Sequence, residues 1–155
     1  ASLSPQAAIE RLKQSGGEEV QVSWVGFATP GNRLAYHLFL ADGSSSLVDA
    51  ATSQQVNAEN VVVLYVSHTF ANKFNAEDEV YHINLVDEGI AYVFRDGVVI
   101  PARWTRPEKE QPLILTTLEG DPIFLRPGRT FYQVIGVTSL LQQDGDVWNF
   151  EFQTP

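Results

Sequence analysis

Tight-turn signals recur along this chain at short intervals, and the segments between them are rich in β-branched and aromatic residues. The strongest signals are the Asp-Gly pairs at residues 42–43, 96–97 and 144–145, which are typical of two-residue hairpin turns. Further turn residues lie at Glu88-Gly89, Gly120-Asp121-Pro122 and Pro127-Gly128. Such close spacing leaves no room for the crossover helices of a parallel sheet. We therefore predict an all-β chain of antiparallel strands, folded as a β-sandwich or a partly open barrel.

The segments between the turns predict strands from about residue 19 to about residue 152. We place them at residues 19–27, 34–41, 60–68, 79–86, 90–95, 98–105, 113–118, 123–126, 130–137 and 146–152.

Two of these strands contain residues that indicate their place in the fold. Residues 61–66 are apolar at every position, which predicts a central strand that is covered on both faces. Pro101 lies inside the strand at 98–105 and has no N–H group to donate to a sheet ladder. We therefore expect that strand to be bulged or to lie at an edge.

One short helix is predicted near the start of the chain, at residues 4–15. Ser4 can cap this helix, and Pro5 suits its first turn. Gly16-Gly17 would end it. No other sizeable helix is expected, so residues 1–155 form a single domain with one helix followed by strands.

Composition limits the classes of partner. The chain has 155 residues, of which 44% are hydrophobic, and a net charge of −9. The length suits one domain with a real core. The negative charge argues against nucleic acid and against a polybasic contact with membranes. The sequence contains no Cys, which excludes disulfides and thiolate chemistry, and no Met, which suggests a processed protein or an excised fragment.

The sequence carries no recognisable catalytic or metal-binding motif. His37, His68 and His82 lack the close spacing of metal ligands, so we expect no metal and no cofactor. Ser67 adjoins His68, but neighbouring strand residues point to opposite faces. The acidic run at residues 77–79 is interpreted as a solvated loop. No catalytic residue is assigned, and we favour a non-catalytic role.

An arginine-rich segment is the strongest candidate for a binding site. Residues 95–129 hold six basic and five acidic side chains within an otherwise acidic chain. The candidate ligand-binding residues are Arg103, Trp104, Arg106, Arg126 and Arg129. Guanidinium groups bind carboxylate and phosphate, and Trp can stack on sugar rings. We predict that these residues share a connected surface that binds an anionic polymer.

An alternative interpretation places Trp104 in the core and the arginines on solvated edges. Trp104 shares its strand face with Val98 and Ile100, which favours this alternative.

Several motifs also resemble those of a known family. The motifs are Phe94-Arg95-Asp96-Gly97, Arg103-Trp104-Thr105-Arg106, Gly120-Asp121-Pro122-Ile123 and Leu125-Arg126-Pro127-Gly128-Arg129-Thr130-Phe131, with Tyr36, Asp49-Ala50, Asn60-Val61-Val62-Val63 and Ser67-His68 upstream. In their order and spacing they resemble the C-terminal domain of the YerB-like lipoproteins, a bacterial family of unknown function. The resemblance covers most of residues 20–137.

The resemblance implies a cellular address and a domain arrangement. The parent protein would be an exported lipoprotein, held to the membrane only through a lipid anchor outside this chain, with a further N-terminal domain. Our first hypothesis is a non-catalytic extracytoplasmic domain that binds an envelope component or a partner protein. The second is part of an envelope glycan-processing enzyme, and the third is a structural domain that positions the missing N-terminal domain. The ligand and the oligomeric state stay open.

Overall fold

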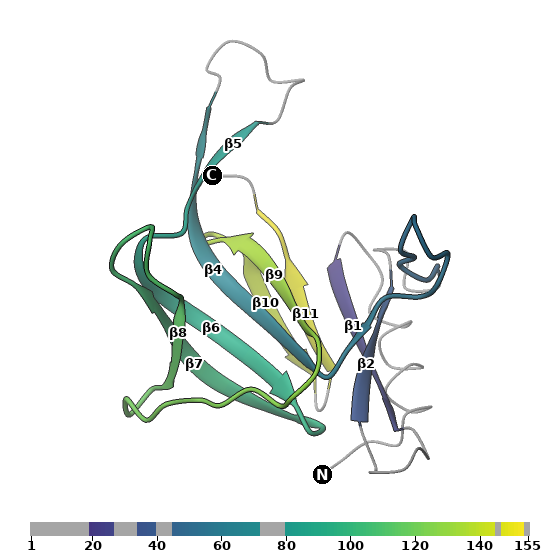
Figure 1. Ribbon diagram of the computed structural model, residues 1–155. Helices are drawn as coiled ribbons and strands as arrows, with labels where there is room; N and C mark the ends of the chain where they lie inside the picture. Colours follow the sequence, from purple (N-terminus) through teal and green to yellow (C-terminus); the bar gives the residue numbers. More distant parts are fainter. Residues whose placement is uncertain (1–18, 27–33, 40–44, 72–79, 145–146, 154–155) are drawn as a thin grey trace.

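The computed structural model describes residues 19–26, 34–39, 45–71, 80–144 and 147–153, and every regular element within them is a β-strand (Figure 1). The strands form two open sheets that pack in the manner of a sandwich, which confirms the predicted all-β class. The predicted helix at residues 4–15 lies outside the described residues.

The first sheet has five antiparallel strands. In spatial order they are β10 (Leu140–Asp144), β11 (Val147–Glu151), β1 (Glu19–Gly26), β2 (Leu34–Phe39) and β3 (Asn57–Ala58).

The second sheet has six strands, and its longest strand lies at the centre. The main path is β5 (Tyr81–Asn84), β4 (Asn60–Phe70), β6 (Asp87–Arg95), β7 (Val98–Arg106) and β8 (Ile114–Thr117). The sixth strand, β9 (Thr130–Gly136), pairs with the same part of β4 as β6 does, so it occupies the opposite edge of β4. This pair is parallel, from Asn60↔Thr130 to Val66↔Gly136, and departs from the predicted antiparallel pattern.

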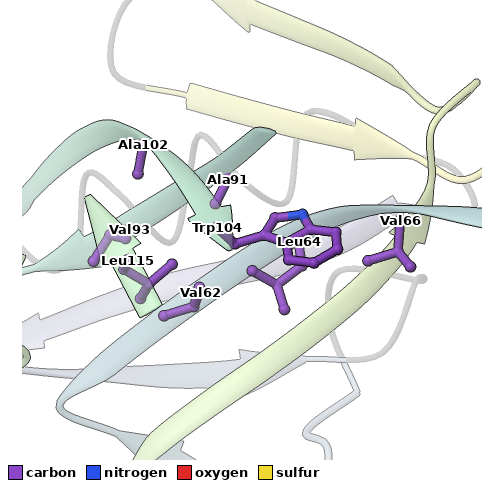
Figure 2. Packing of buried hydrophobic residues seen from close by; sticks show 8 residues of the cluster. All are labelled: Val62, Leu64, Val66, Ala91, Val93, Ala102, Trp104 and Leu115. Carbon is purple, nitrogen blue, oxygen red and sulfur yellow. The ribbon is translucent and has the colours of Figure 1, made fainter. Parts of the chain in front are cut away.

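β4 separates two hydrophobic cores, as its unbroken apolar run predicted. Val61, Val62, Val63 and Val66 each have 0% of their surface exposed. The even-numbered side chains face the first core, whose buried members are Val62, Leu64, Val66, Ala91, Val93, Ala102, Trp104 and Leu115 (Figure 2). The odd-numbered side chains face the second core, which lies between the sheets and contains Tyr36, Leu38, Val61, Val63, Phe94, Ile135 and Phe150.

Two local predictions are wrong, each for a physical reason. Glu88-Gly89 is not a turn but lies inside β6. Gly89 is there because a Cβ atom would lie 2.5 Å from the Trp104 indole nitrogen. Residues 123–126 do not form a strand. The segment meets β8 through an isolated bridge from Thr116 to Pro122, where the Ile123 nitrogen donates to the Leu115 oxygen at 2.9 Å, and proline has no N–H group to extend this bridge into a ladder.

Other local predictions agree with the structure. Asp96 and Gly97 have positive φ angles of 52° and 74°, as a primed hairpin turn between β6 and β7 requires. Pro101 lies in β7 just outside the residues that pair with β8, which begin at Ala102, so this part of the strand is locally an edge. β3 and β10 were not predicted, since β3 is very short and β10 lacks alternation.

Candidate functional site

Trp104 is a core residue and is not available as a stacking platform. Its side chain is 2% exposed and packs in the first core. The indole nitrogen donates a hydrogen bond to the backbone oxygen of Tyr65 over 2.9 Å. The alternative interpretation of Trp104 is therefore the correct one.

The predicted arginines fall into two groups at opposite ends of the β6–β7 hairpin. Arg106 pairs across the hairpin with Asp87, at the open end. Arg126 forms an ion pair with Asp96, in the turn at the closed end. Each strand of the hairpin has nine residues, which corresponds to roughly 30 Å of length. The prediction of one connected arginine surface is therefore wrong.

The two arginines near the open end already have partners within the chain. Arg106 donates hydrogen bonds to the backbone oxygens of Leu85 (3.3 Å), Gln111 (3.0 Å) and Lys109. It thereby fastens the segment that leaves β7. Arg103 forms an exposed ion pair with Glu88 at 3.1 Å.

The arginines at the closed end belong to a structural link that we call the β4 clamp, formed by Glu59, Asn60, Arg126, Gly128 and Arg129. The Asn60 side chain donates to the Arg126 oxygen at 2.9 Å and accepts from the Arg126 nitrogen at 2.8 Å. The Glu59 carboxylate accepts from the backbone nitrogen of Arg129 at 2.7 Å. Gly128 has a φ of +136°, and a Cβ atom there would lie 2.6 Å from that carboxylate. The clamp thus fixes the turn that leads into β9.

Perturbed titrations in the described residues also have structural causes. Burial raises the pKa of Tyr36 far above its ordinary value, and its hydroxyl oxygen accepts a hydrogen bond from Gly97 at 3.2 Å. Burial raises the pKa of Tyr65 to about 12. Hydrogen bonds from Thr52 and Ala51 lower the pKa of the Asp49 carboxyl, which closes a local turn. The Tyr36 and Asp49 side chains thus hold nearby backbone groups.

Within the described ranges, no group of three or more His, Asp or Glu side chains is arranged to hold a metal ion. None of the described residues belongs to a helix long and apolar enough to cross a membrane.

The structure also has an exposed surface that the sequence did not predict. We call it the outer face, and it consists of Glu88, Ile90, Pro101, Arg103 and Ile114. The strand register places them together, because Ile90 lies opposite Arg103, and Ile114 lies opposite Thr105, which neighbours Glu88. Ile90 is 58% exposed and Ile114 is 52% exposed. The Arg103–Glu88 ion pair lies between them. β6, β7 and β8 lie on the side of the molecule away from β1 and β2 (Figure 1).

The outer face continues a surface that is core elsewhere. On the same side of the sheet, Tyr92 and Phe94 pack against Trp148 of β11, with ring centroids 5.5 and 6.1 Å apart. One half of this sheet face is therefore covered by the first sheet, and the other half is open. Alternation in the sequence shows which side chains of β7 share a face. Only the cross-strand register shows that Ile90 and Ile114 lie on the same face as Pro101 and Arg103.

Comparison with known proteins identifies the family. Residues 35–132 match the C-terminal domain of the family described as a protein of unknown function (DUF3048). This chain belongs to the DUF3048 family. The motifs that carried the resemblance lie within the matched DUF3048 residues, and the predicted C-terminal domain of a family of unknown function is confirmed.

Among solved structures, the DUF3048 domain is similar to the crystal structure of the YerB protein from Bacillus subtilis, at 19% identity and a TM-score of 0.49. The similarity covers 80% of this chain and 43% of the YerB chain, so the domain spans less than half of that protein. No curated protein matches the sequence.

Proposed function

We propose that this DUF3048 domain is a non-catalytic binding module that holds a protein partner on its outer face. The observation that carries the proposal is the half-covered sheet, in which exposed Ile90 and Ile114 adjoin side chains that are core on the same face. Apolar residues around an arginine, with polar groups at the border, are typical of protein interfaces. An anionic polymer is less well supported, because Arg103 already pairs with Glu88.

The partner that we propose is the part of the protein that precedes this domain in its family. The matched family describes a C-terminal domain, so its members contain sequence upstream. A covalently linked partner is present at high effective concentration, so a modest apolar surface is enough to hold it. The YerB-like resemblance leads us to propose further that this assembly is extracytoplasmic and anchored by lipid outside the present chain.

The test is a binding measurement between this domain and the upstream part of the full-length gene product, produced as a separate polypeptide. We expect the double substitution Ile90→Lys and Ile114→Lys to weaken binding at least about tenfold, because two apolar contacts become desolvated charges. Isothermal titration calorimetry would measure the dissociation constant. Binding should persist at high salt, whereas binding to an anionic polymer would weaken with salt.

The matched control is Val98→Lys, which changes a valine that is 55% exposed and lies outside the outer face. It should leave the affinity unchanged, and circular dichroism should show that all variants are folded. The proposal fails if the upstream polypeptide does not bind, or if the double variant and the control bind as tightly as the natural sequence.

A further inference from the structure

β9 has one edge that no described strand covers. Among the strands that the structure describes, it pairs with β4 alone. Its sequence, Thr-Phe-Tyr-Gln-Val-Ile-Gly, contains no charged residue and no proline. Seven residues in extended form span about 23 Å, with backbone donors and acceptors along the edge that no described strand covers. Such an edge is a template for another strand.

The other two edges of this sheet are blunted. β5 has only four residues, and an edge this short offers few hydrogen-bonding groups. β8 also has four residues, and its outer side carries the isolated bridge from Thr116 to Pro122. β9 has neither device, so among the described strands its unpaired edge is a distinct feature of this sheet.

The sequence of β9 is complementary to itself in the antiparallel direction. If Gln133 lies on a two-fold axis, Tyr132 of one copy lies opposite Val134 of the other, and Phe131 lies opposite Ile135. Aromatic and β-branched residues are favourable cross-strand pairs. Tyr132 is 45% exposed, so it has apolar surface left to bury.

We propose that β9 is a dimerisation strand, through which two copies of this domain pair edge to edge in antiparallel fashion. A second copy fits better than an unrelated strand, because an isologous contact requires this kind of self-complementarity. Each copy carries a net charge of −9, so two copies repel each other, and pairing through a segment without charge adds no further local repulsion. β4 separates β9 from β6 to β8, which leaves the outer face available (Figure 1).

We expect the dimer to be weak, because a single pair of strands buries a small interface. Analytical ultracentrifugation across the micromolar range should show a mass that rises with protein concentration. Added salt should favour the dimer by screening the repulsion between the two acidic copies.

The decisive variants are Gln133→Lys and Gln133→Glu. Either one places two like charges opposite each other at the two-fold axis and should weaken the dimer roughly tenfold. An equimolar mixture of the two should restore association, because the charges then attract. A loss caused by misfolding would not be restored by mixing.

Gln142→Lys is the control, because Gln142 is an exposed glutamine on β10 and not on β9. It should dimerise like the natural sequence. A protein that is monomeric at every concentration would overturn the proposal. So would dimers that both Gln133 variants leave intact, or a mixture that associates no better than its components.

Discussion

Replacing Val62 with aspartate is expected to remove roughly 4 kcal/mol or more of stability, and so to leave the domain largely unfolded. Val62 is fully buried in the first core, with Val93 opposite it on β6 and Tyr132 opposite it on β9. The other members of that core are hydrophobic side chains, which cannot pair with a carboxylate. The carboxylate would therefore lose its hydration without gaining a partner. Urea unfolding followed by Trp fluorescence measures the effect.

The control for Val62→Asp is the same substitution at Val98, which is 55% exposed at the start of β7. Its cost should stay within about 0.5 kcal/mol, as for most surface changes. Equal unfolding midpoints for the two variants would contradict the assignment of β4 as the covered central strand.

Replacing Asn60 with alanine is expected to cost about 3 kcal/mol, the second largest effect. The Asn60 side chain is fully buried, with its amide nitrogen 2.9 Å from the Arg126 oxygen and 3.1 Å from the Thr130 hydroxyl. Its oxygen accepts from the Arg126 nitrogen at 2.8 Å. Alanine would leave these part-buried groups of Arg126 and Thr130 without their Asn60 partner, at about 1–3 kcal/mol for each group left unsatisfied.

Hydrogen exchange distinguishes a loss of the β4 clamp from a general loss of stability. In Asn60→Ala, amides of residues 130–136 should exchange faster than those of the β6–β7 hairpin. Asn84→Ala, at an exposed position on β5, serves as the control and should change neither rate. Uniform acceleration across the whole sheet would speak against a clamp that acts on β9.

The strands were predictable because their signals are local. Alternation located β7, the unbroken apolar run located β4, and Asp96-Gly97 located the turn between β6 and β7. Gly89 misled because glycine serves both turns and close packing, and only the neighbouring Trp104 shows which role applies. The parallel pairing of β4 with β9 has no local signal, since the partner residues lie 70 positions apart.

The candidate site was predicted less well, because it depends on register and on the path of connecting segments. Arg103 and Arg126 are close enough in sequence to suggest one surface, but the chain crosses from one end of the hairpin to the other between them. Arg126 and Arg129 belong to the motifs that carry the family resemblance, yet their contacts are structural. The outer face was missed because Ile90 and Ile114 come from different strands, β6 and β8, and are placed on one face only by the pairing of both strands with β7.

The parallel pairing of β4 with β9 also predicts an order of events during folding. β4 can find β6 through a hairpin-like search, but β9 must be brought from 70 positions further along the chain. Closing so long a loop before its contacts form slows folding. Until then, the most apolar strand of the chain has one side open to other molecules. β4, the most deeply buried strand of the folded domain, is therefore covered on both edges only late in folding. We expect the chain to be most prone to aggregate before β9 has paired with β4.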